Sequence, residues 1–132
     1  EKVCLSIDLS AKGSIPLPYG GKLSWEVLPI EGLQGDIRVP PTVALFDYDL
    51  LGATTLTLRS REEGDALRPY GMKGKKLLRR IFIDGKYTHQ ERREALLVCK
   101  EGALLWLVGH VADSTYALSA YTRKVLRLTY HP

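Results

Sequence analysis

The chain has 132 residues and a formal net charge of +4, with 45% hydrophobic and 26% charged residues. This composition is typical of one soluble globular domain spanning residues 1–132, and no apolar run approaches the ~18 residues that a membrane span requires. Cys4 and Cys99 lie far apart and suggest neither a disulfide framework nor a zinc knuckle. We therefore expect a cytoplasmic protein with no membrane partner. Because it begins at Glu1 without an initiator Met, we expect a fragment of a longer protein.

Alternating apolar and polar residues predict strands at 3–9, 23–27 and 42–46. Between the first two, residues 11–22 contain several Gly and Pro and are predicted as a loop. This loop could be disordered or an ordered connection, and its apolar residues favour the ordered form. Asp47 and Asp49 could suggest a metal site or an acid/base pair, but a turn that ends the strand is favoured because no His or third carboxylate lies nearby.

The stretch 58–86 concentrates the basic charge of the chain. It holds nine Lys or Arg against four Asp or Glu, a balance of +5 that exceeds the +4 of the whole chain. Residues 55–61 alternate as a strand that would bury Leu56 and Leu58 and project Arg59 and Arg61 from the other face. Local basicity combined with glycine-rich turns is typical of a phosphate-contacting surface.

After this strand, Gly64 and Asp65 predict a turn, and 69–74 predict a stiff, tight loop. Apolar residues at helical spacing then predict a short helix that starts near Lys75, with lysines and arginines on its other side. Strand, loop and helix start would form one anion-binding surface. Pro69 and Lys76 stand where a Walker loop needs Gly and Ser or Thr, so this is no nucleotide-binding loop of that kind.

The last third predicts a helix and three strands. Thr88 and Glu91 form a capping-box pattern for a helix ending near Ala95. Residues 96–99 and 103–108 read as a hairpin of strands covered on both faces, and 125–130 as a final strand. Trp106 could be a base-stacking platform, but its apolar neighbours favour a core position. The three His residues are isolated, so we expect no metal site.

The residues of the basic stretch resemble the C-terminal domain of tRNA(Ile)-lysidine synthetase. The resemblance covers about 43–128. The matching residues are Leu58, Arg59, Arg61, Gly64, Asp65, Pro69, 71–77, 82–84, Lys86, Glu91, Arg92, 96–98, 105–109 and 122–126.

By pattern the chain is α+β, with seven or eight mostly antiparallel strands and two short helices. The resemblance adds that these form a compact β-sandwich of uncommon topology, related to a domain of the phenylalanyl-tRNA synthetase β-chain. It also implies a parent enzyme that uses ATP and lysine to convert the wobble cytidine of tRNA(Ile) to lysidine. ATP and Mg would belong to an N-terminal catalytic domain marked by a Ser-Gly-Gly-x-Asp-Ser loop, which is absent from these 132 residues. The fragment is thus expected to carry no catalytic residue and no cofactor.

What the resemblance leaves for this fragment is recognition of tRNA(Ile), on the acceptor-stem side, through the basic glycine-containing loop. Structured RNA is read largely through its shape and phosphates, which calls for placed cations. Asp65 is expected to cap a turn or to hold a neighbouring Arg. The predicted RNA-binding residues are Arg59, Arg61, Arg68, Lys73, Lys75, Lys76, Arg79, Lys86 and Arg92, and the predicted loop-shaping residues are Gly64, Asp65, Pro69, Gly71 and Gly74.

Two departures from the family pattern stand out. Arg79 and Arg80 replace a Ser-Asp pair and add charge, whereas 110–118 lack three expected cations. The main alternative is a protein–protein module that packs against its own N-terminal catalytic domain or forms a homodimer, using the Leu-rich strands and Trp25. A self-contained enzyme is the weakest alternative because no nucleophile, base and oxyanion set is visible. The sequence leaves open which part of the tRNA is contacted, whether the fragment binds alone, and the oligomeric state.

Overall fold

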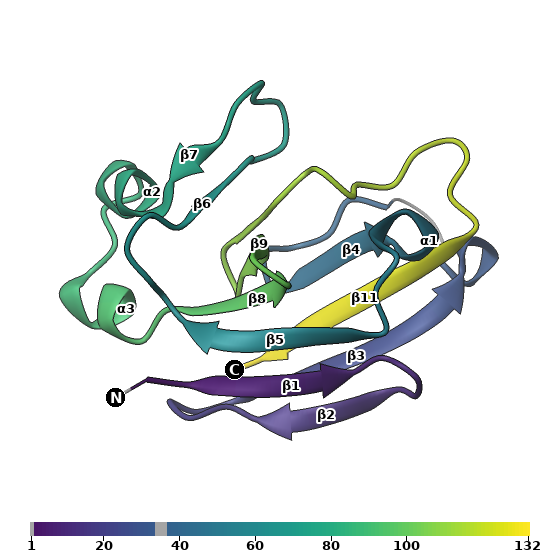
Figure 1. Cartoon of the computed structure of the whole chain (residues 1–132), viewed down its shortest axis with the longest axis horizontal. Coiled ribbons are helices and arrows are strands. Elements are labelled where there is room, and N and C mark those ends of the chain that lie inside the picture. Colours follow the sequence, from purple (N-terminus) through teal and green to yellow (C-terminus); the bar gives the residue numbers. More distant parts are fainter. Residues whose placement is uncertain (1, 34–36) are drawn as a thin grey trace.

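The computed structural model describes residues 2–33 and 37–132, so Glu1 and 34–36 lie outside it. Two antiparallel sheets face each other as a sandwich (Figure 1). The first sheet has the order β1 (Cys4–Asp8), β5 (Thr55–Ser60), β8 (Leu96–Lys100), β9 (Ala103–Leu107) and β10 (Val111–Ala112). The second has the order β2 (Gly13–Pro16), β3 (Lys22–Pro29), β11 (Lys124–His131) and β4 (Val43–Asp47).

The chain crosses between sheets instead of completing one before the other. The last strand, β11, pairs with both β3 and β4 in the middle of the second sheet. Similarly, β5 joins the N-terminal strand β1 to β8. The α+β class and the mostly antiparallel sandwich are confirmed, and the non-sequential strand order explains why alternation alone did not give the topology.

The core lies between the two sheets. Alternate residues of the strands supply it: Ile7, Phe46 and Leu58 are completely buried, and Trp106 is 1% exposed. The core interpretation of Trp106 is therefore confirmed, and a stacking role is wrong. Trp25 is also buried, and its indole N–H donates to the carbonyls of Asp8 and Ala11, both at 3.0 Å. Neither Trp25 nor the buried Leu-rich strands offer a surface to a partner protein.

A second cluster covers the outer face of the five-stranded sheet. Leu97, Cys99 and Leu107 project there from β8 and β9 and meet Leu67 and Phe82. The two strands are thus buried on both faces, as their continuous apolar runs predicted. This outer cluster joins the basic stretch to the sandwich.

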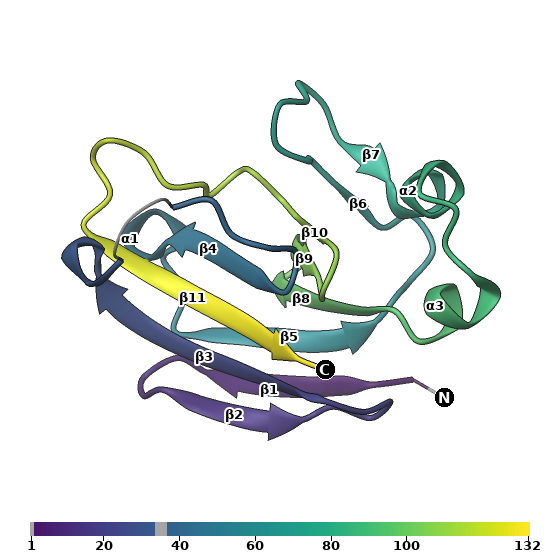
Figure 2. The same ribbon diagram turned by 180° about the vertical axis from the view of Figure 1, so that it is seen from behind.

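Short helices and a two-stranded hairpin complete the described part of the chain. They are η1 (Ile30–Gly32), α1 (Tyr48–Leu51), α2 (Leu78–Asp84), α3 (His89–Arg93), β6 (Ala66–Leu67) and β7 (Lys76–Leu77). In Figures 1 and 2 the hairpin, α2 and α3 lie together at one end of the sandwich. None of the described helices has the length and apolar character needed to cross a membrane.

Three details differ from the sequence prediction. Residues 13–16 form β2 inside the expected loop, where Gly13 is needed because a Cβ there would lie 2.8 Å from the Trp25 ring. Helix α2 begins at Leu78 and not near Lys75, because Lys76 and Leu77 pair with β6. The turn after β4 is confirmed, but it continues as α1, with Asp47 accepting the Leu50 N–H as N-cap.

The predicted capping box of α3 is present. Thr88 Oγ1 accepts the Glu91 N–H at 3.0 Å, and the Glu91 carboxylate accepts the Thr88 N–H at 2.8 Å. We expect Thr88→Ala to lower the free energy of unfolding by about 1 kcal/mol, because an N-terminal donor loses its acceptor. Thr88→Ser keeps the hydroxyl and should unfold close to the native urea midpoint. Equal midpoints for Thr88→Ala and the native protein would contradict the role of the cap.

Candidate nucleic-acid interface

The basic stretch forms a projection that runs from the end of β5 through the β6–β7 hairpin into α2 (Figures 1 and 2). Its anchors are apolar: Leu67 is completely buried, and Leu78, Ile81 and Phe82 are at most 6% exposed. These side chains fix one face of the projection on the sandwich. The charged residues between them are consequently held on the other face.

The loop between β6 and β7 carries Lys73 and Lys75, both exposed. A turn closes it, in which the Met72 N–H donates to the Pro69 carbonyl at 3.1 Å. Gly71 has φ +87°, a left-handed conformation that favours glycine, so its predicted loop-shaping role fits the structure. No ion pair restrains either lysine within the described residues. Both ammonium groups are available to a ligand.

The root of this loop is held by Asp113, a residue that the sequence analysis did not single out. Its side chain accepts the Arg68 N–H at 2.6 Å and the Thr115 N–H at 2.8 Å. The Ser114 N–H also donates to the Arg68 carbonyl at 2.8 Å. Asp followed by Ser and Thr signals a local turn, but no sequence pattern indicates a contact 45 residues away.

Arg59 has a structural role in a largely buried ion pair. Its guanidinium donates to the two carboxylate oxygens of Asp65 at 2.9 and 3.1 Å, and the two side chains are only 14% and 7% exposed. Hydrogen bonding to Asp65 raises the pKa of Arg59. Asp65 also accepts the Glu62 N–H at 2.7 Å. Both roles predicted for Asp65, capping a turn and holding an Arg, are confirmed.

Two further arginines pack over the aromatic ring of Phe82. The guanidinium carbons of Arg61 and Arg92 lie 5.3 and 5.9 Å from its centroid, within cation–π range. The Arg92 Nε also donates to the Tyr87 carbonyl at 3.2 Å. Tyr87 stands 5.1 Å from the same ring, and burial raises its pKa. Phe82 therefore positions two predicted RNA-binding cations.

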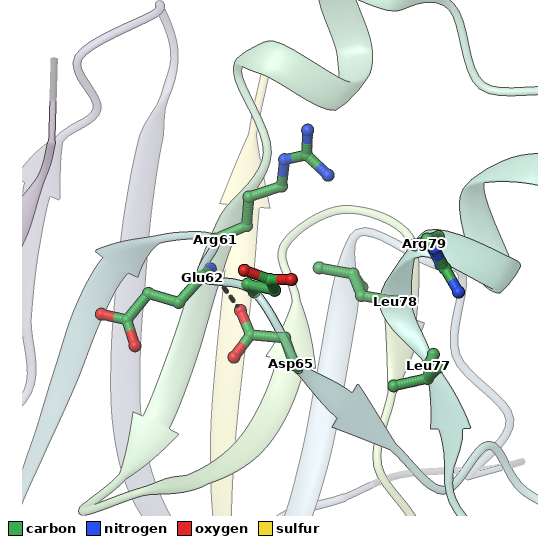
Figure 3. A pocket seen from close by; sticks show the side chains of 8 residues that line it. Arg61, Glu62, Asp65, Leu77, Leu78 and Arg79 are labelled. Carbon is green, nitrogen blue, oxygen red and sulfur yellow. Dashed lines mark hydrogen bonds between the residues drawn. The ribbon is translucent and has the colours of Figure 1, made fainter.

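A hollow separates the Glu62–Asp65 turn from the start of α2 (Figure 3). Arg61 and Arg79 line it, but so do Glu62, Glu63 and Asp65, with Leu78 between them. Asp65 is already paired with Arg59, which leaves Glu62 and Glu63 against Arg61 and Arg79, so the hollow carries no excess of positive charge. The single anion-binding surface expected from strand, loop and helix start is thus interrupted at this point.

A groove with four cationic lining residues lies at β7 and α2. It is lined by Lys75, Lys76, Leu77, Arg79, Arg80 and Ile83. The one carboxylate paired with these cations in the described structure is Asp84, 2.7 Å from Lys76 Nζ and 3.4 Å from Arg80 Nε. Hydrogen bonding to Lys76 lowers the pKa of Asp84. We call this feature the β7–α2 groove.

The structure therefore divides the predicted site residues. Lys73, Lys75, Lys76 and Arg79 are brought together on the hairpin and α2, whereas Arg59 faces inward. Lys86 is exposed beyond the end of α2. Among the loop-shaping residues, Gly64 has φ +88° like Gly71, but Gly74 does not have a positive φ. In the described ranges, no group of three or more His, Cys, Asp or Glu side chains could hold a metal ion.

Comparison with known proteins agrees with this architecture. Residues 56–128, more than half of the chain, match the family described as the TilS substrate C-terminal domain. The chain belongs to this family. A crystal structure of a TilS C-terminal domain has the same fold, with a TM-score of 0.79 and 23% identity over 98% of this chain and 97% of that one.

Longer relatives share the TilS C-terminal sequence. A tRNA(Ile)-lysidine synthase of Porphyromonas gingivalis is 35% identical over 79% of this chain and 24% of its own length. One of Caldanaerobacter subterraneus is 32% identical over 98% of this chain and 27% of its own length. The chain thus spans about a quarter of the length of these curated relatives.

Proposed function

We propose that this TilS C-terminal domain binds tRNA(Ile) for a tRNA(Ile)-lysidine synthase. The observation that carries the proposal is the cationic face of the hairpin and α2. There Lys73, Lys75, Arg79 and Arg80 are exposed, and Asp84 is the carboxylate that pairs with the groove. In this role the domain contacts the acceptor-stem side of the tRNA, and ATP, Mg and lysine are used by the N-terminal catalytic part of the parent enzyme.

The physical form of the surface supports recognition of an RNA backbone. An A-form stem displays phosphates and 2′-hydroxyls, and a protein recognises it mostly by shape and by these groups. Arg79 can contact a phosphate with two parallel hydrogen bonds, whereas Lys73 and Lys75 act as mobile point charges. The hydrophobic anchoring of α2 fixes the backbone that carries Arg79 and Arg80.

Charge removal tests the proposal. We expect the double variant Lys73→Gln/Lys75→Gln to bind tRNA(Ile) more weakly in fluorescence anisotropy. In a salt series, its slope of log affinity against log salt should be smaller by about 0.7–0.9 for each lost phosphate contact. The slope is the deciding quantity because it counts contacts independently of overall fold stability.

A matched control is Lys12→Gln/Lys22→Gln, which removes two exposed lysines beside β2 and β3 in the other sheet. Its slope should stay near the native value. Equal slopes for the native protein and Lys73→Gln/Lys75→Gln would remove the loop from the RNA contact. Equal losses in both variants would show a non-specific charge effect.

A further inference from the structure

The β7–α2 groove combines two features that a plain phosphate surface does not need. Two of its lining side chains are apolar, Leu77 and Ile83, which are exposed by 45% and 48% and which we call the floor. The other four, Lys75, Lys76, Arg79 and Arg80, are cationic and are called the rim. Large exposed apolar side chains beside four cations indicate a ligand that is both anionic and apolar.

The groove is held in shape before any ligand binds. The opposite face of α2 is fixed by Leu78, Ile81 and Phe82 in the outer core cluster. Asp84 pairs with both Lys76 and Arg80, at 2.7 and 3.4 Å. Lys75 and Arg79 form no ion pair among the described residues, so they can receive negative charge. Such preorganisation lowers the entropic cost of binding.

We propose that the β7–α2 groove binds an unpaired nucleotide of the RNA, with its base against Leu77 and Ile83 and its flanking phosphates on Lys75 and Arg79. This inference rests on the proposed function and specifies which part of an RNA the groove takes. A paired stem turns its bases inward and offers phosphates and sugars, which would leave the apolar floor uncovered. A splayed base covers that floor, and its phosphates meet the rim. An acidic protein segment also offers both chemistries, and RNA is favoured because it is the ligand of the proposed function.

The test uses RNA hairpins of one stem sequence, either blunt or with four unpaired nucleotides added at the 3′ or the 5′ end. We expect at least one extension to strengthen binding to the native chain about tenfold, the gain that covering roughly 55 Å² of apolar surface provides. Leu77→Ala/Ile83→Ala should abolish most of this gain and change blunt-stem affinity less than about twofold. Its salt slope should stay native, because an apolar contact releases no counterions.

Leu5→Ala/Leu50→Ala is the matched control, since both leucines are similarly exposed, at 43% and 59%, and lie on β1 and α1. This control should keep the full gain from the extension. An equal gain in Leu77→Ala/Ile83→Ala, or no gain with either extension, would overturn the proposal while binding of the blunt stem upheld the RNA-binding function. No binding of any RNA would overturn both. Loss of a homodimer in Leu77→Ala/Ile83→Ala, with RNA binding unchanged, would assign the groove to protein contact instead.

Discussion

Phe82→Ala is expected to lower the free energy of unfolding by about 3–5 kcal/mol, in the range typical of removing a buried aromatic ring. The ring is 1% exposed and packs in the outer cluster with Leu67, Leu78 and Ile81. This cluster joins the basic projection to the sandwich, so the cavity would weaken the attachment of α2. Urea denaturation followed by circular dichroism measures the loss.

Phe82→Leu separates packing from the aromatic contact. It keeps most of the apolar volume and should cost less than about 1.5 kcal/mol. It removes the ring face beneath Arg61 and Arg92, a contact of about 0.5–1 kcal/mol for each cation. We therefore expect Phe82→Leu to fold and yet to bind tRNA more weakly if Arg61 and Arg92 contact it. A Phe82→Ala protein with the native urea midpoint would show that the cluster does not stabilise the domain.

Sequence periodicity predicted most of the sandwich for a simple reason. Period-two alternation reports which face of a strand is buried, and in β3 and β5 one face meets the core while the other is more exposed. Strands β1 and β11 follow it less strictly, because Leu5 is 43% exposed and the neighbouring Val125 and Leu126 are both buried. The continuous apolar runs of β8 and β9 reported burial on both faces. The capping box was also predictable from the sequence, because Thr88 and Glu91 interact within one turn of helix.

Contacts between residues far apart in the chain could not be predicted from the sequence. Strand β2 exists because β3 pairs with it and the Trp25 indole binds the chain just before it, whereas its own Gly and Pro residues indicate a loop. Helix α2 starts later than predicted because residues 76–77 pair with β6. Helix propensity is weak enough for such pairing to override it.

The same limit applies to the site. Counting charges along the stretch 58–86 treats Arg59 and Arg79 alike, yet Arg59 is held by Asp65 in a largely buried pair and Arg79 is exposed. The pair stabilises the turn, so Arg59 has a structural role beside the candidate interface. The charged side chains of the hairpin and α2 that remain exposed to solvent are those on the face opposite the buried apolar anchors. Charge count indicated a candidate region, and burial shows which of its side chains reach solvent.

Asp113→Ala is expected to lower the free energy of unfolding by about 2–4 kcal/mol, because the Arg68 and Thr115 N–H groups both lose their acceptor. Asp113 is itself 6% exposed, so water replaces the carboxylate poorly. Amide hydrogen exchange should accelerate at Arg68 and Ser114 first, since these residues connect the loop root to the sandwich. Native exchange rates at these amides would contradict the anchoring role.

Whether Asp113→Ala raises or lowers the affinity for tRNA distinguishes two roles of Asp113: positioning the loop, or acting through its own negative charge. Removing a carboxylate near a phosphate-binding surface strengthens binding if charge alone matters. Glu63→Ala removes an exposed carboxylate from the hollow of Figure 3, and we expect it to strengthen tRNA binding for this reason. Asp113→Ala also removes a negative charge, yet we expect it to weaken tRNA binding, because Lys73 and Lys75 are carried by the loop whose root it fixes. Stronger binding by both variants would show that Asp113 acts through its charge, whereas opposite changes would establish that the fold positions the cations through this one buried carboxylate.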